Sequence, residues 1–573
     1  MPESSAPPPV PPLWVLGAAA AGEEAAAAEL SRALGVEPLV AALLVRRGFP
    51  TPEAAQHFLT PRLGDLFDPF LLTDLKEAAI TIAGAVARRE PIAVFGDYDA
   101  DGITSSALLC RFLRALGGNA EPFLPLRREE GYGLTRAAAA RCLETLRPKL
   151  LVAVDCGTSS HAEIAWLKEQ GVEAVVVDHH ELPETLPACR AFVNPHRDDP
   201  AQPAAASARQ LASVGLVFKL CHGLLKLEPA WRERIDLRDH LDLVAVGTVA
   251  DLVPLRNENR ILVRHGLARL DQGGNPGLQA LIAVAGVRRP VTADDIGFRI
   301  APRINASGRL DDAAASLRLL LTDDPAEAAR LAEALDGQNR ERQTLEQQTY
   351  DEALSLLGGA LPEGALILGR RGWHVGVIGI VASRLQKRYG RPAIVIGIDE
   401  NGEGKGSGRS VEGCSLVLGL QEAAPLLLRF GGHEMAAGLS IREEHLPTFQ
   451  DRFNGWLRKA VRPEDLVPRL RVDAALDPAE ISENLYHSLD RLAPFGRENP
   501  QPVFALRRVA LRRPPQAVKR HIKLFLDGER EAIGFGFADR AYPGGPLSIA
   551  GSLSWDDYRG RVQVRMIDWK REP

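Results

Sequence analysis

Residues 92–102 read Ile-Ala-Val-Phe-Gly-Asp-Tyr-Asp-Ala-Asp-Gly, an apolar run that ends in three aspartates spaced two apart. Three further apolar runs also end in carboxylate or imidazole side chains: residues 150–154 before Asp155, residues 174–177 before Asp178-His179-His180, and residues 243–250 before Asp251. Short buried strands that each deliver such a side chain at the carboxyl end build a site in the crevice of an open α/β sheet. We therefore expect all four runs to be strands of one such sheet.

A set of carboxylates at one edge of a sheet favours a metal site, because the carboxylates repel each other unless cations neutralise them. The expected ligands are four carboxylates and one imidazole: Asp99, Asp101, Asp155, Asp251 and His179. Hard oxygen ligands with a single imidazole suit Mn²⁺ or Mg²⁺ better than structural zinc. Two such cations about 3.5–4 Å apart would activate a water and stabilise a developing phosphoryl charge, which favours phosphoester chemistry over acyl transfer.

Each motif also has a structural alternative. An EF-hand loop would need a glutamate at its twelfth position, and counting from Asp97 that position is Leu108. An acidic turn that caps the following helix is the other alternative for the first motif. Asp251 taken alone fits a buried helix cap as well as a ligand. Several apolar runs that each end in a carboxylate or imidazole side chain are nevertheless much less expected by chance than a single one.

The bulk composition bounds the class of protein. A chain of 573 residues is too long for one core and suggests about three or four domains. The net charge of −5 gives no global basic field, although a local basic face can bind a polyanion. Six scattered cysteines without a Cys-x-x-Cys pair predict reduced thiols and a cytoplasmic location. With no signal-like segment and no apolar run of 18 residues, we expect no membrane partner.

The order of sequence patterns predicts a multidomain α/β chain. Short apolar runs that alternate with helical stretches indicate a largely parallel sheet. A stretch that lacks proline but has a polar middle indicates a helix bridging two domains. The expected segments are a helical extension (1–75), a parallel-sheet catalytic domain (76–321), a connecting helix (322–357), a second α/β domain (358–464) and a β-barrel domain (465–573).

The motifs resemble those of the DHH phosphoesterase superfamily. Four stretches carry the resemblance: Gly-Asp-Tyr-Asp-Ala-Asp-Gly (96–102), Val-Asp-Cys-Gly (154–157), Asp-His-His (178–180) and Gly-Thr-Val-Ala-Asp-Leu-Val-Pro (247–254). A fifth, Gly-Gly-His-Glu-Met-Ala-Ala-Gly (431–438), resembles the signature of the associated DHHA1 domain. More narrowly, the chain is similar to the RecJ-type single-strand-specific exonucleases, with supporting stretches at 127–133, 301–309, 373–379 and 492–500.

The resemblance implies a role for each metal-site residue. Asp99 and Asp101 would hold separate metals, and Asp155 would bridge them. His179 and Asp251 would complete the second metal's ligands, while His180 would contact the scissile phosphate or help the leaving group. Many superfamily members carry a histidine where this chain has Phe95. The first metal would then have fewer protein ligands, and Asp97 is a candidate to compensate.

The resemblance also implies contacts to nucleic acid. Arg127 would lie near the nucleic-acid end, and Ser407 with Arg409 would grip a terminal phosphate. Other implied contacts are Arg303, Asn305 and Arg309 along the strand path, and His433 in a glycine-rich turn.

Residues 507–523 hold seven Lys or Arg and no acidic residue, including Lys519, Arg520 and Lys523. On a small barrel this tract favours sequence-neutral single-strand binding over a merely solvated basic face. The resemblance implies an oligonucleotide-binding (OB) fold for the barrel.

These observations together predict a two-metal exonuclease of single-stranded DNA. The resemblance adds degradation from the 5′ end to 5′-mononucleotides, in DNA recombination and repair. It also suggests a monomer with a single-strand-binding protein or a helicase as candidate partners. Two alternatives stay open at this point: a DHH-family nuclease of short oligoribonucleotides, which would not need the basic tract, and a non-catalytic DNA-binding scaffold.

Overall fold

The computed structural model describes residues 7, 9–17, 22–127, 129–310, 313–359, 361, 363–527, 530–538, 540, 542–556 and 559–572, without the side chains of residues 309, 310 and 463. The chain divides into two compact units. The first unit comprises residues 49–340 and 492–501, and the second comprises residues 1–48, 341–491 and 502–573. The expected extension 1–75 is therefore divided between them. No helix in the described part of the chain is long and apolar enough to cross a lipid bilayer.

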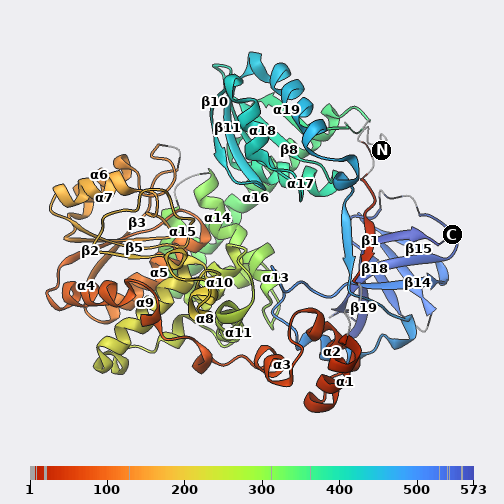
Figure 1. Ribbon diagram of the computed structural model, residues 1–573, viewed down its shortest axis with the longest axis horizontal. Helices are drawn as coiled ribbons and strands as arrows, with labels where there is room; N and C mark the ends of the chain where they lie inside the picture. The colour runs from red at the N-terminus through yellow and green to blue at the C-terminus, as the bar shows by residue number, and fades with distance from the viewer. Residues whose placement is uncertain are drawn as a thin grey trace. The chain divides into compact units, whose positions relative to one another are not determined.

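The first unit is built on a parallel sheet of five strands in the order β3-β2-β4-β5-β6 (Figure 1). The strands are β2 (Pro91–Phe95), β3 (Asn119–Phe123), β4 (Leu150–Val154), β5 (Glu173–Val177) and β6 (Ala191–Val193). Three of the four predicted strands are thus present, as β2, β4 and β5.

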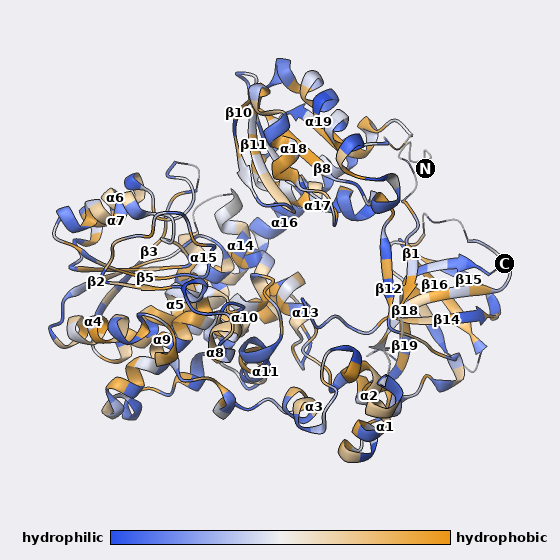
Figure 2. Cartoon of the chain, viewed as in Figure 1, coloured by the Kyte–Doolittle hydropathy of each residue, from blue (hydrophilic) through white to orange (hydrophobic). Residues whose placement is uncertain are grey.

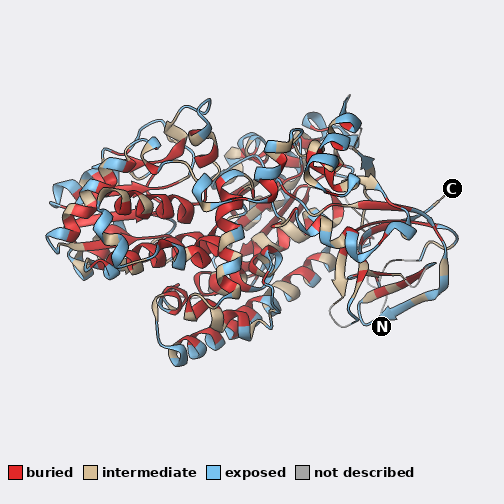
Figure 3. Ribbon diagram, turned by 90° about the horizontal axis from the view of Figure 1, so that it is seen from below, coloured by how far each residue is buried: buried red, intermediate tan, exposed pale blue. Residues whose placement is uncertain are grey.

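Side chains alternate between the two faces of this sheet, and each face is covered by helices. Ile92 and Val94 join the core formed with α4 (Leu75–Ala87), α5 (Ala100–Ala115) and α9 (Ser213–Leu227). Ala93 and Phe95 join a second core with α6 (Arg136–Leu146) and α7 (His161–Glu169). Strands buried on both faces read as continuous apolar runs, as parallel sheets require. Figures 2 and 3 show apolar, buried residues running through these layers.

The prediction of a strand at residues 243–250 is wrong. These residues belong to helix α10 (Leu241–Ala250), in which every residue from Leu241 to Val249 is buried. The helix packs against α5, α9 and α11 (Asn257–Asp271). A helix that is apolar all round has no periodicity to distinguish it from a buried strand, which explains the error. Asp251 still follows the run directly, as the residue that caps the C-terminus of α10.

The remaining helices of the first unit surround this layer. They are α3 (Pro52–Leu59), α8 (Pro203–Ala208), α12 (Pro276–Val284), α13 (Ala293–Asp295), α14 (Ala301–Leu310) and α15 (Ala314–Leu321), with a π-helical turn at Ile296–Ile300. The predicted connecting helix is α16 (Pro325–Leu356). Its early residues, such as Leu331, join the core of the first unit, whereas Tyr350 and Ala353 join a core of the second. Its polar middle separates these two buried ends.

The second unit holds a mixed sheet of five strands in the order β10-β11-β9-β8-β7. The strands are β7 (Leu366–Arg371), β8 (Ala393–Ile398), β9 (Glu403–Arg409), β10 (Leu427–Gly432) and β11 (Ala436–Arg442). One face packs on α17 (Val375–Tyr389), and the other on α18 (Leu416–Glu422) and α19 (Leu446–Ala460).

The C-terminal β-domain of the second unit is a seven-stranded, mostly antiparallel sheet in the order β13-β14-β18-β19-β17-β16-β15. Its strands are β13 (Ala474–Ala475), β14 (Phe504–Val509), β15 (Leu511–Val518), β16 (His521–Leu526), β17 (Glu531–Gly534), β18 (Leu547–Asp556) and β19 (Arg561–Arg571). Helix α20 (Glu483–Asp490) precedes β14. Near the N-terminus, β1 (Leu13–Leu16) pairs with β12 (Arg469–Val472), ahead of α1 (Glu23–Leu34) and α2 (Pro38–Arg46).

Candidate metal centre and nucleic-acid contacts

The acidic loop after β2 is fixed by backbone amides. Asp99 caps α5, and its Oδ1 accepts hydrogen bonds from the backbone N–H groups of Asp101 and Gly102, both at 3.0 Å. Gly102 is required because a Cβ there would lie 2.5 Å from the Asp97 carbonyl oxygen. The Asp101 carboxylate accepts from the N–H groups of Ser213 (2.7 Å) and Val214 (2.9 Å), at the N-terminus of α9. Two helix N-termini therefore direct these carboxylates.

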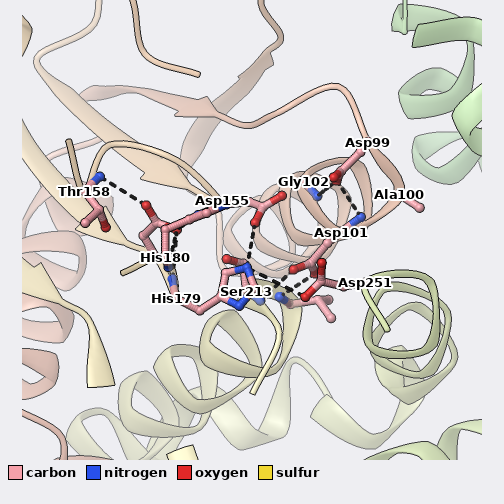
Figure 4. A network of polar contacts seen from close by, with 12 residues as sticks. Asp99, Ala100, Asp101, Gly102, Asp155, Thr158, His179, His180, Ser213 and Asp251 are labelled. Atoms are coloured by element: carbon pink, nitrogen blue, oxygen red, sulfur yellow. Dashed lines mark hydrogen bonds and ion pairs between the residues drawn. The ribbon is translucent and has the colours of Figure 1, made fainter. Parts of the chain in front are cut away.

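The ends of β4, β5 and α10 bring the other predicted ligands to the same place. His179 Nε2 lies 3.4 Å from Asp155 Oδ1 and 3.7 Å from Asp251 Oδ2. Figure 4 shows the side chains of Asp101, Asp155, His179 and Asp251 converging. Among the described residues three sets of donor atoms, each within 4.8 Å of one another, could hold an ion: Asp97, Asp99 and Asp155; Asp101, His179 and Asp251; and Asp155, Asp178, His179 and His180.

Asp97 supplies the test of whether this cluster fits a cation. Its carboxylate is fully buried, and neither oxygen has a hydrogen-bond partner among the described residues. A buried carboxylate without partners is strongly unfavourable unless a cation neutralises it. The donor set of several carboxylates and one imidazole suits hard divalent ions. The residues present therefore fit Mn²⁺ or Mg²⁺.

Crowding of the carboxylates raises their pKa values. Burial, together with the charge of Asp99, raises the pKa of Asp97 to about 7. Burial and the neighbouring Asp251 raise the pKa of Asp101 to about 7, and burial with Asp99 does the same for Asp251. Burial and four neighbouring carboxylates, Asp101 first among them, hold the pKa of Asp155 well above its usual range. A divalent ion would remove this repulsion.

His180 is held at both ring nitrogens. Its Nδ1 lies 2.7 Å from Asp178 Oδ1, and its Nε2 lies 2.9 Å from the Tyr132 hydroxyl. Burial opposes charge on His180, but the hydrogen bond to Asp178 raises its pKa to about 9. Burial alone would raise the pKa of Asp178, yet the hydrogen bond and charge of His180 lower it overall. Asp178 also accepts a hydrogen bond from the Thr158 N–H at 3.1 Å. This contact holds the Asp178 carboxylate in place beside His180, with which it forms an ion pair.

The residues expected along the strand path are mostly paired within the first unit. Asn305 Oδ1 accepts from the Ala100 N–H at 2.8 Å, so it supports the acidic loop. Arg303 Nη2 lies 2.7 Å from Asp336 Oδ1 and is nearly buried. The Arg127 guanidinium carbon lies over the Tyr98 ring, 5.0 Å from the ring centroid. The side chain of Arg309 lies outside the described residues.

Ser407 and Arg409 lie two apart on β9 and share one face of the sheet. Arg409 Nη1 donates to Ser407 Oγ at 3.1 Å. Gly379, in the first turns of α17, packs so closely that a Cβ would lie 3.0 Å from Ser407 Oγ and 3.2 Å from Arg409 Nη2. Burial lowers the pKa of Arg409. His433 follows Gly432 (φ +138°) in the turn between β10 and β11.

The basic tract on the β-domain is partly neutralised. Lys523 forms an ion pair with the buried Glu531, which also binds Arg559 and Arg561. Lys519 and Arg520 are exposed in the turn between β15 and β16. Phe525, which follows the tract by two residues, is buried, and the Arg513 guanidinium lies 3.5 Å from the centroid of its ring.

The exposed aromatic residue next to this tract is Phe535, which sequence reasoning missed. Its side chain is 51% exposed, and its ring lies 5.0 Å from His521 with the Arg565 guanidinium 5.6 Å from its centroid. No alternation in the sequence separates an exposed aromatic residue such as Phe535 from a buried one such as Phe525.

Comparison with known proteins identifies the family. Models of the DHH family N-terminal domain, the DHHA1 domain and the RecJ OB domain match residues 91–248, 363–459 and 472–568. The single-stranded-DNA-specific exonuclease RecJ of Bacillus subtilis is 37% identical over 549 residues, covering 94% of this chain and 68% of that protein. The Escherichia coli RecJ is 35% identical over 524 residues, covering 87% and 90%.

The chain belongs to the RecJ family. A crystal structure of Thermus thermophilus RecJ in complex with Mn²⁺ has a TM-score of 0.83 and 34% identity, covering 98% of this chain and 80% of that one. A second, of exonuclease RecJ bound to manganese, has a TM-score of 0.59 and 40% identity, covering 69% and 96%. The predicted organisation of DHH, DHHA1 and OB-type domains is confirmed.

Sequence reasoning gave no role to Asp178 or Tyr132, although both lie in stretches that carry the RecJ resemblance. Asp178 begins the Asp-His-His motif, and Tyr132 lies in the stretch 127–133. Their spacing in the chain gives no sign that Tyr132 reaches His180 across 48 residues.

Because the pKa values of the carboxylates are raised, the stabilisation of the fold by bound Mn²⁺ depends on pH. A carboxyl group whose pKa rises from 3.8 to about 7 on folding destabilises the fold as pH rises through that range. At pH 8 Mn²⁺ binds ionised ligands, whereas at pH 6 it must displace protons. We expect Mn²⁺ to raise the Tm more at pH 8 than at pH 6, as measured by thermal unfolding. Equal shifts at both pH values would contradict this.

The ion pair of His180 and Asp178 can be tested by its effect on a pH–rate profile. In Asp178→Asn the His180 pKa should fall from about 9 toward its ordinary value of about 6.5, so the basic limb of the profile should move down with it. The control is Tyr132→Phe, which removes the contact at Nε2 without removing a charge and should leave that limb in place. If both variants moved the limb alike, the ion pair would not be its cause.

Proposed function

We propose that this chain is a metal-dependent exonuclease that hydrolyses single-stranded DNA from the 5′ end to 5′-mononucleotides, in DNA recombination and repair. The observation that carries the proposal is the meeting of two donor sets: Asp97, Asp99 and Asp155 in one, and Asp101, His179 and Asp251 in the other, with His179 Nε2 3.4 Å from Asp155 Oδ1. The relatives named single-stranded-DNA-specific exonuclease, which are similar over most of the chain, support the substrate class.

The two donor sets fit two Mn²⁺ or Mg²⁺ ions. Asp97, Asp99 and Asp155 would hold one ion, and Asp101, His179 and Asp251 the other, with Asp155 near enough to His179 to serve both. When bound, two divalent ions supply an activated water and neutralise charge that develops on the phosphoryl group. Asp97 would take the place left by Phe95, because neither of its carboxylate oxygens has a hydrogen-bond partner among the described residues.

His180 would contact the scissile phosphate from the side of the metal centre. With a pKa of about 9 its ring is protonated at neutral pH, and Asp178 fixes its orientation through Nδ1. Nε2–H then faces the Tyr132 hydroxyl, which a phosphate oxygen of the substrate would replace or join. A protonated imidazole in that place can stabilise negative charge or donate its Nε2 proton to the leaving oxygen.

The other contacts are assigned to nucleic acid. Ser407 and Arg409 would bind the terminal phosphate and so determine polarity, and His433 of the same unit would have the same role. Arg127, in the first unit, would contact the nucleic acid near its end. Lys519, Arg520 and Phe535 would bind the strand on the OB domain, while Lys523, paired with Glu531, would only support that surface. Arg303 and Asn305 would act by positioning α14. Arg309 remains an assignment from the resemblance.

Further inferences concern the whole chain. We place the domain boundaries at 76–321, 358–464 and 465–573, with the connecting helix at 322–357 and the extension at 1–75. We also infer a cytoplasmic monomer that works with a single-strand-binding protein or a helicase, since exposed single strands arise where such proteins act.

A time course on single-stranded DNA with 5′ or 3′ end labels, with and without Mn²⁺, tests activity, polarity and metal need together. Asp155→Asn should lower the rate at least about 10³-fold because it removes a carboxylate from both ions. The control, Asp451→Asn on the exposed face of α19, should keep the wild-type rate. Preference for di- or trinucleotides of RNA would favour an oligoribonuclease, and unchanged cleavage by Asp155→Asn would refute the metal assignment.

Phe535 provides a separate test of the OB domain. Replacement by Leu should weaken binding of oligo(dT) by about 1–3 kcal/mol, the usual contribution of one stacked base. Phe535→Trp keeps an aromatic face and should restore the affinity. Fluorescence anisotropy in EDTA measures both without cleavage. Equal affinity for Leu and Trp at this position would show that the ring does not stack on a base.

A further inference from the structure

Ten residues from the C-terminal part of the chain fold with the first unit. Residues Leu492–Gln501, here called the strap, follow α20 and precede β14, which both belong to the second unit. The strap contains the whole stretch 492–500 that supports the family resemblance, yet none of its residues has a part in the metal centre or the nucleic-acid contacts described above.

A buried arginine anchors the strap. Arg260 on α11 is 2% exposed, and its guanidinium donates to the carbonyl oxygens of Leu492 (3.0 Å), Ala493 (2.8 Å) and Phe58 (2.8 Å). The guanidinium also lies 3.7 Å from the centroid of the Phe58 ring. A buried cation needs such partners, because leaving one unpaired is strongly destabilising. The strap is therefore a fixed part of the first unit.

The strap then closes into a tight turn. Backbone hydrogen bonds join Gly496 and Asn499 in both directions, at 3.0 and 3.2 Å. The buried amide of Asn499 donates to the carbonyls of Leu492 and Pro494, at 2.9 and 2.8 Å. Within the turn Glu498 is exposed and has a φ of +58°. That conformation is unfavourable for most residues and most of all for β-branched ones.

The turn holds the loop that follows Asp251. The Leu255 N–H donates to the Arg497 carbonyl at 2.9 Å, and Arg497 Nη1 donates to the Leu252 carbonyl at 3.3 Å. From the loop itself, Arg256 Nε donates to the Glu498 carbonyl at 3.3 Å. Gly496 lies so close that a Cβ would come within 2.6 Å of Leu255 Cδ1. Four contacts thus join the turn to Leu252, Leu255 and Arg256.

Asp251 depends on this loop more than Asp99 and Asp101 depend on theirs. Asp99 and Asp101 each accept two backbone hydrogen bonds that fix their carboxylates. Among the described residues the Asp251 carboxylate lies 3.7 Å from His179 Nε2 but accepts no such hydrogen bond. It sits at the end of α10, where Leu252 already has a φ of +59°. Its direction is therefore determined by the backbone that the strap holds.

We propose that the strap is a positioning element of the metal centre, which holds Asp251 beside Asp101 and His179 so that the second ion can bind. This inference rests on the proposed function, since it concerns the same two-ion site. Residues 492–501 lie outside the DHH domain in the sequence. Metal binding in the first unit would therefore require the part of the chain that leads into the OB domain.

The test compares two substitutions at one exposed position in the full-length protein, Glu498→Val and Glu498→Gly. Both remove the same charge, but valine disfavours the positive φ and glycine favours it. Titration calorimetry with Mn²⁺ at pH 8 should find two ions bound by the wild type and by Glu498→Gly. Glu498→Val should bind one ion about 10–100-fold more weakly, the usual cost of losing a residue that supports a ligand. Arg264→Ala, which loses only an exposed contact to the Ala493 carbonyl, should bind like the wild type.

The outcomes distinguish a failure of the strap's proposed role from a failure of the proposed function. Circular dichroism checks that each variant folds. If Glu498→Val does not fold, Glu498→Ala takes its place and should bind one Mn²⁺ ion more weakly than Glu498→Gly does. Equal Mn²⁺ affinity for the glycine and valine variants would overturn the strap's role. Unchanged Mn²⁺ affinity with weaker oligo(dT) binding in EDTA would also overturn it and make the strap a DNA contact. A wild type that binds no Mn²⁺ would instead refute the proposed function.

Discussion

The mutual repulsion of buried carboxylates is the constraint on which the first unit depends. Asp97, Asp101 and Asp155 are almost wholly buried, and their pKa values are raised because burial and neighbouring charges oppose ionisation. A fold tolerates such a cluster only where protons or cations neutralise it. The helix N-termini of α5 and α9 offset part of the charge, and divalent ions would offset the rest.

This constraint explains how the surrounding polar groups are used. Asp178 is equally buried, but its pKa is lowered because His180 supplies the compensating charge. The same cluster therefore contains carboxylates poised to take a cation and one that already has its partner. Asn305, which sequence reasoning assigned to the nucleic acid, instead fixes the acidic loop through the Ala100 N–H.

Charged side chains on the OB domain are also paired with one another before any strand binds. Glu531, outside the basic tract, pairs with Lys523, Arg559 and Arg561, so one lysine of the tract is already neutralised. Lys519, Arg520 and the Phe535 ring are among the residues that stay exposed. Sequence-neutral binding of single strands needs this combination of cations with an accessible aromatic face.

The sequence by itself determined the strands β2, β4 and β5, the connecting helix and the residues that gather at the sheet edge, because buried parallel strands and acidic strand ends leave local patterns. It could not distinguish α10 from a strand, since an all-apolar run has no period. Only the tertiary structure decided that Tyr132 meets His180, that Lys523 is neutralised and that residues 492–501 support Asp251. Those contacts join residues far apart in the chain, and no local pattern records which distant group a side chain will meet.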